Sequence, residues 1–145
     1  MFESSINRDH NRNFFLLIQI IFFIKKEVEG LSVGQQKINN VVRRFSYLIE
    51  KNKDGQAYSD FKEGINEGLE IAKDTFEENV GKFDFSCSDE DRDARIQRLQ
   101  NLFNLLIDTI EITKKPNYSR DQLEGIYKGF EKSKKLFNEF IKELI

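Results

Sequence analysis

The chain has 145 residues, one His, one Cys and a formal net charge of −2. This length fits one domain with a substantial core, and the charge gives no general attraction to nucleic acid or to anionic lipid. A single His and a single Cys exclude an internal disulfide and a zinc site with the usual nitrogen and sulfur ligands. We therefore expect a cytoplasmic protein that binds neither a metal nor a cofactor.

The N-terminal part of the sequence carries an almost uninterrupted apolar run, residues 14–24, after a polar arm over 1–9. As a helix this run spans about 16 Å, against ~30 Å for a hydrocarbon core, so we expect no membrane span. The sequence predicts a helix over 10–29, ended by Gly30. A surface helix needs only one apolar stripe, so we expect this helix to be covered on nearly all sides. Either the chain's own bundle or a second copy in a homodimer or larger oligomer provides that cover.

Apolar residues at intervals of three and four predict four further helices, in two hairpins over 32–80 and 88–145. Ser59 or Asp60 is the expected N-cap of one helix, and Ser119 begins a capping box at the start of another. Period-two alternation, which is typical of strands, is absent. The sequence therefore predicts an all-α fold of five helices in a single domain over 1–145.

The two hairpins share an internal repeat. When residues 63–79 are set against residues 124–140, eight of the 17 aligned positions are identical. The preceding helices match at an offset of 58, which pairs Phe45 with Phe103. We therefore expect a duplicated helical hairpin that forms a pseudo-two-fold bundle, with an extra apolar N-terminal helix.

Two glycines four residues apart recur in both copies, as Gly64 and Gly68 and as Gly125 and Gly129. Each glycine inside a helix costs roughly 1 kcal/mol relative to alanine, so the repetition needs a reason. One interpretation is a close approach of two helices. The other is a strip of bare backbone that a ligand or a partner helix contacts.

Arg43 and Arg44 have no acidic residue within four positions on either side. Because arginine pairs well with carboxylates and phosphates, both are candidates for contact with an anion or a partner, and the alternative is a solvated face. Tyr127 is a further candidate contact. An enclosed pocket lined by these residues would indicate a site for an anionic nucleotide.

The sequence contains no residue set typical of an enzyme. Any Ser-His-acid or Cys-His arrangement would have to use His10, in the polar arm, and there is no phosphate-binding loop or dinucleotide fingerprint. We therefore expect a non-catalytic protein–protein interaction module. Two other classes stay open: a sensor or sponge for an anionic nucleotide, and a small helical subunit of a nucleic-acid-binding complex, for which the charge gives little support.

Frequent Ile, Lys, Asn and Phe are typical of AT-rich genomes. Small helical bundles occur among immunity proteins and phage-encoded inhibitors, although a shared fold class says little about function. On that analogy we expect an inhibitor or immunity-type protein of a phage, a plasmid or a low-GC bacterium. The identity of its protein partner does not follow from the sequence.

Overall fold

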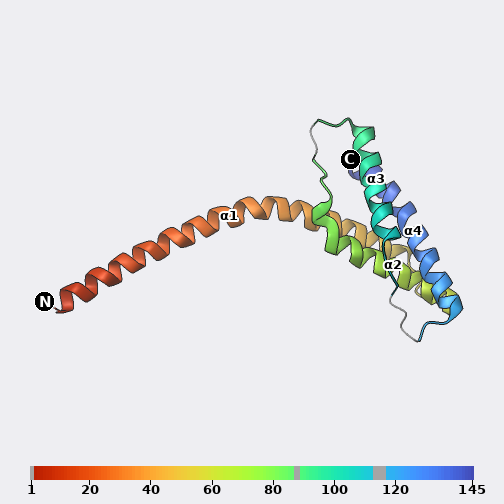
Figure 1. Ribbon diagram of the computed structural model, residues 1–145, viewed down its shortest axis with the longest axis horizontal. Helices are drawn as coiled ribbons and strands as arrows, with labels where there is room; N and C mark the ends of the chain where they lie inside the picture. Colours follow the sequence, from red (N-terminus) through yellow and green to blue (C-terminus); the bar gives the residue numbers. More distant parts are fainter. Residues whose placement is uncertain (1, 87–88, 113–116) are drawn as a thin grey trace. The chain divides into compact units, whose positions relative to one another are not determined.

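The computed structural model describes the backbone of residues 2–86, 89–112 and 117–145, and within these ranges the side chains of 13–21 and of residues from 35 onward. The helices are α1 (Phe2–Asn52), α2 (Asp60–Asn79), the short 3-10 helix η1 (Val80–Lys82), α3 (Arg92–Asp108) and α4 (Arg120–Leu144) (Figure 1). No strand occurs in the described ranges, so the all-α class is confirmed.

The helix α1 continues from Phe2 to Asn52 without a break. The structure thus differs from the sequence prediction of a polar arm over 1–9, a helix that ends at Gly30 and a separate helix that starts after it. No described glycine has a positive φ, so Gly30 does not adopt the left-handed conformation that commonly ends a helix. A single internal glycine costs only roughly 1 kcal/mol, and the residues on both sides of Gly30 are helical.

Backbone contacts divide the chain into two units, Met1–Asn39 and Asn40–Ile145. Unit 1 contains only the N-terminal part of α1. Unit 2 contains the C-terminal turns of α1 together with α2, η1, α3 and α4. Within unit 2, α2 packs along α4, and α3 contacts both of these helices.

Four phenylalanines, one from each of α1, α2, α3 and α4, form the centre of the core of unit 2. Phe45, Phe76, Phe103 and Phe137 are at most 1% exposed. Each ring contacts the other three, and the centroid distances range from 4.0 to 5.9 Å. Because burial of a phenylalanine side chain contributes roughly 1.5–3 kcal/mol, this cluster is a major source of the stability of unit 2.

Side-chain caps fix where α2 and α4 begin. The hydroxyl oxygen of Ser59 accepts a hydrogen bond from the backbone N–H of Lys62 at 3.2 Å. The hydroxyl oxygen of Ser119 accepts one from the backbone N–H of Gln122 at 3.1 Å. Of the two candidates Ser59 and Asp60, the cap of α2 is Ser59, and the predicted cap at Ser119 is confirmed. Each satisfies a donor that the first turn of a helix otherwise leaves unpaired.

The four repeated glycines lie where α2 meets α4. All four are buried. A Cβ atom added to Gly68 would lie 3.0 Å from the Cα of Ile126, and one added to Gly129 would lie 2.9 Å from the Cα of Gly68. The absence of side chains therefore allows the two helix backbones to come into direct contact.

A lysine in each hairpin bridges two carboxylates, one on its own helix and one on the helix before it. Lys73 of α2 contacts Glu70 at 2.7 Å and Glu50 of α1 at 3.5 Å. The corresponding residue of the second hairpin is Lys134 of α4, which contacts Glu131 at 3.1 Å and Asp108 of α3 at 2.5 Å. Positions that match in the sequence thus make matching ion pairs.

Candidate binding surfaces

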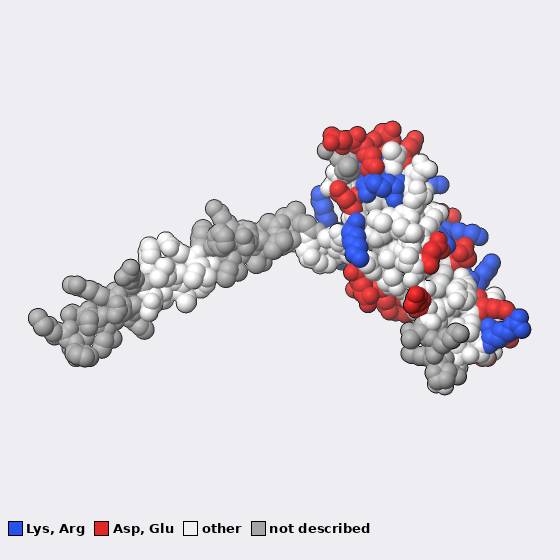
Figure 2. Space-filling model, in the orientation of Figure 1, with Lys and Arg blue, Asp and Glu red and all other residues white. Residues whose placement is uncertain are grey.

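The first candidate surface is the apolar band of α1, which we define as residues 14–21. Its seven apolar side chains are between 47% and 65% exposed. They are Phe14, Phe15, Leu16, Leu17, Ile18, Ile20 and Ile21. Figure 2 shows this stretch of α1 without a charged side chain. The band belongs to the run for which the sequence predicted cover on nearly all sides.

The exposed apolar side chains do not form a single stripe. Successive helical residues are about 100° apart, so Phe14, Phe15, Leu16 and Leu17 already point in four different directions around the axis. A two-helix seam buries one stripe of each helix, so it covers only part of the band. Among the described residues, no helix has an apolar stretch long enough to cross a membrane.

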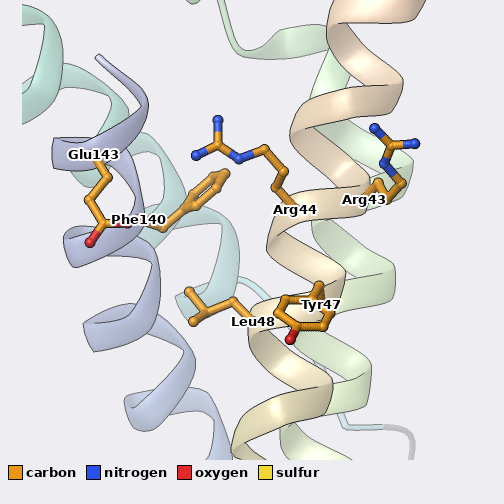
Figure 3. Close-up of a pocket in the computed structure, with 6 residues that line it drawn as sticks. All are labelled: Arg43, Arg44, Tyr47, Leu48, Phe140 and Glu143. Carbon is orange, nitrogen blue, oxygen red and sulfur yellow. The ribbon is translucent and has the colours of Figure 1, made fainter.

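The second candidate surface is a hollow of about 410 Å³ in unit 2, which we call the α1–α4 pocket (Figure 3). It opens to solvent and is lined by Arg43, Arg44, Tyr47, Leu48, Phe140 and Glu143. The first four residues are on α1 and the last two are on α4. The pocket thus combines two cationic side chains with an apolar and aromatic surface.

The two arginines of this pocket have different neighbours. The guanidinium carbon of Arg44 lies 5.8 Å from the ring centroid of Phe140, in a cation–π arrangement. Arg43 donates a hydrogen bond from Nη2 to the Oδ1 atom of Asn40 at 3.1 Å. Figure 3 shows Arg44 extending from α1 toward Phe140, while Arg43 lies on another side of α1. The pocket thus presents two cationic groups in two directions.

Tyr127 does not join Arg43 and Arg44. Its side chain is 58% exposed, and it lines a separate hollow of about 160 Å³ together with residues that include Phe130 and Lys134. The α1–α4 pocket is open, whereas the nucleotide interpretation required an enclosed site. The structure therefore brings two of the three candidate contact residues to one pocket and leaves the third elsewhere.

The glycine strips are not open to a ligand. Backbone atoms of α4 occupy the space in front of Gly64 and Gly68, and backbone atoms of α2 occupy the space in front of Gly125 and Gly129. Of the two interpretations that the sequence left open, close helix approach describes the arrangement in this chain.

Sequence reasoning missed the other lining residues of the α1–α4 pocket. Tyr47 lies three and four positions after Arg44 and Arg43, which places it on the same side of a helix, so this spacing was an available signal. Phe140 and Glu143 carried no signal, because only tertiary packing brings α4 beside α1.

Within the described ranges, no group of three or more His, Cys, Asp or Glu side chains is placed to hold a metal ion. Cys87 lies outside the described residues. No protein-family model matches this chain, and neither a curated protein nor a solved structure shows significant similarity to it.

Proposed function

We propose that this chain is a non-catalytic module that binds other protein chains, its own copies included, through the apolar band of α1. The observation that carries the proposal is the exposure of the seven apolar side chains of the band, which ranges from 47% to 65%. Proteins rarely leave a contiguous apolar patch of this kind in water unless it serves as a contact surface.

The size of the hydrophobic effect supports a protein partner. Full burial of a Leu, Ile or Phe side chain contributes roughly 1.5–3 kcal/mol, and the band offers seven half-exposed side chains of these types. Since the band faces all directions, we propose that several neighbouring chains or helices surround it. A homodimer would cover part of the band, and a larger oligomer would cover more of it.

We further propose that unit 2 is a duplicated helical hairpin with approximate two-fold symmetry and acts as a scaffold. The equivalent ion pairs of Lys73 and Lys134 support this. The glycine contacts support the symmetry as well. A Cβ atom added to Gly64 would meet the carbonyl oxygen of Gln122, and one added to Gly125 would meet the carbonyl oxygen of Phe61. Gln122 and Phe61 are 61 positions apart, as are Gly125 and Gly64. A packed scaffold of this kind explains most of the recurring residues without catalysis.

The residue inventory supports a binding role over an enzymatic one. The chain has one His and one Cys, so the usual nucleophile and base combinations have almost no members. We also propose a cytoplasmic location, since a lone cysteine suits a reducing compartment. An inhibitor or immunity-type role fits a protein that acts by binding alone.

The test is sedimentation velocity of the full chain between about 1 and 100 μM, a range that covers typical dimer affinities. We expect the wild-type chain to sediment as a dimer or larger. The double variant Leu17→Gln with Ile21→Gln should shift the species toward the 17.1 kDa monomer. The matched control is Leu105→Gln on α3, because Leu105 is 62% exposed and Leu17 is 57% exposed.

A wild-type chain that stays monomeric over this range would contradict self-association. Binding to neutral phosphatidylcholine vesicles, abolished by the same double variant, would assign the band to lipid instead of protein. Equal effects of the band variant and of Leu105→Gln would show that any exposed leucine promotes association nonspecifically.

A further inference from the structure

The two arginines of the α1–α4 pocket have no acidic partner among the described residues. Neither Arg43 nor Arg44 forms an ion pair there, although Glu143 lines the same pocket. By contrast Arg98 pairs with Glu90 at 2.9 Å. Two cations beside one carboxylate leave the pocket with an excess positive charge, while the whole chain has a net charge of −2.

The hairpin fold does not require arginine at these positions. At the offset of 58, Arg43 corresponds to Asn101 and Arg44 to Leu102 on α3. Tyr47 corresponds to Leu105. The second copy therefore builds the same kind of helix with neutral residues, so the cationic and aromatic surface is specific to the first copy.

We propose that the α1–α4 pocket binds an acidic segment of a partner protein. A carboxylate of that segment pairs with Arg44 or Arg43, and a neighbouring aromatic or aliphatic side chain packs on Tyr47 and Leu48. The inference deepens the proposed protein-binding function, but it concerns a different surface from the apolar band and can be tested separately.

Three features favour a polypeptide over a free nucleotide. The pocket is open to solvent and Tyr47 is 69% exposed, whereas small-molecule sites enclose most of their ligand. Arginine and tyrosine, together with tryptophan, are enriched among the residues that dominate the binding energy of protein interfaces. Glu143 repels a second anionic group but accepts hydrogen bonds from the N–H groups of a peptide.

The test measures binding of the full chain to three fluorescently labelled probes: a random Glu–Tyr copolymer, poly-glutamate and AMP. The pocket variant is Arg43→Gln with Arg44→Gln. Its matched control is Lys128→Gln with Lys135→Gln, which removes the same charge from two exposed residues of α4. Neither control lysine lines the pocket.

We expect the Glu–Tyr copolymer to bind more tightly than poly-glutamate, because only the copolymer offers aromatic side chains to Tyr47. The pocket variant should lose roughly tenfold or more in affinity for the copolymer, since it removes both arginines with which the carboxylate can form a charge-assisted contact. The lysine control should change the affinity by less than roughly twofold. Tyr47→Ala should reduce the preference for the copolymer over poly-glutamate.

Equal losses in the pocket variant and the lysine control would overturn the proposal, because they would indicate general charge attraction. Tight binding of AMP with the same dependence on Arg43 and Arg44 would overturn it in favour of a small-anion site. The absence of copolymer binding would also overturn it. Measurement of the copolymer on the variant with Leu17→Gln and Ile21→Gln separates this pocket from the band, since the pocket proposal predicts unchanged affinity there whatever the oligomeric state.

Discussion

Gly64 and Gly125 face each other so closely that a Cβ atom added to either would lie 2.9 Å from the Cα atom of the other. Real Cβ atoms essentially never come this close to backbone atoms. The neighbouring atoms belong to helix backbones, so no side chain can rotate away to make room. The α2–α4 packing therefore depends on glycine at these positions.

We predict that Gly125→Ala destabilises the protein by about 1–3 kcal/mol, as overpacking does in other cores. The direction of this change in stability is informative, because replacing glycine by alanine stabilises an isolated helix by roughly 1 kcal/mol. Urea unfolding followed by circular dichroism provides the measurement. Gly81→Ala is the control, since nothing lies within 4 Å of a Cβ added there. If both variants were equally stable, the close approach of α2 and α4 would not exist.

Local signals in the sequence predicted much of the fold. Some features depend only on neighbours within one or two helical turns, so the sequence alone predicts them. These are the three- and four-residue spacing of the apolar positions that include Phe45 and Phe103, and the hydroxyl caps at Ser59 and Ser119. The continuity of α1 through Gly30 could not be predicted, because glycine both ends helices and is tolerated inside them.

The candidate pocket was less predictable than the helices. The sequence singled out Arg43 and Arg44 by the absence of local acidic partners. It could not show that Phe140, almost a hundred positions later, lies beneath one of them. It also grouped Tyr127 with the arginines, and the structure places Tyr127 at a different hollow. Contacts between distant helices depend on packing that no local pattern encodes.

A second prediction compares Tyr58 and Tyr118, each of which directly precedes a serine N-cap, Ser59 or Ser119. The hydroxyl of Tyr118 donates a hydrogen bond to a carboxylate oxygen of Glu67, whereas Tyr58 is 86% exposed. Tyr118→Phe should therefore cost about 1 kcal/mol of stability at pH 7, and Tyr58→Phe should cost almost nothing. Urea unfolding of the two variants tests this, and equal stabilities would contradict the assignment of the bond.

The same hydrogen bond predicts a change at alkaline pH. The bond to Glu67 raises the pKa of Tyr118 above its ordinary value of 10.0, and burial acts in the same direction. A group with a raised folded-state pKa stabilises the fold below its unfolded pKa, and this contribution is lost as the pH rises through the folded value. We expect absorbance titration to show one tyrosine that ionises late, and Glu67→Gln should remove most of that delay.

A third prediction concerns stability in acid. Hydrogen bonds from Lys53 and then from Lys73 lower the pKa of Glu70 from 4.5 to about 2. Because the folded-state pKa is depressed, the stabilisation is present above pH 4.5 and is lost as the pH falls toward 2. Glu70 is 39% exposed, so solvent screens these pairs and the effect should be modest.

Glu70→Gln should therefore make the stability of the chain less dependent on pH between about 4.5 and 2. Urea midpoints at several pH values in this window provide the comparison with the wild-type chain. Glu78→Gln changes the charge by the same amount on the same helix, and Glu78 forms no ion pair among the described residues. A pH profile of Glu70→Gln that matches the profile of Glu78→Gln would contradict the role of this cluster.

The last prediction tests the continuity of α1. If Gly30 lies inside a helix, as the structure shows, Gly30→Ala should stabilise the helix locally by roughly 1 kcal/mol. If Gly30 instead ended a helix in the left-handed conformation, alanine would be strained there and the same substitution would destabilise it. The two arrangements thus predict opposite changes in local helix stability for the same substitution.

Hydrogen exchange of the backbone amides at residues 31–36 measures the direction of this change, because slower exchange in Gly30→Ala means a more stable helix at that point. Gly55→Ala, in the turn before α2, is the control, since it should leave exchange at residues 31–36 unchanged. Faster exchange in Gly30→Ala would show that α1 is two helices and that the apolar band sits on a separate segment.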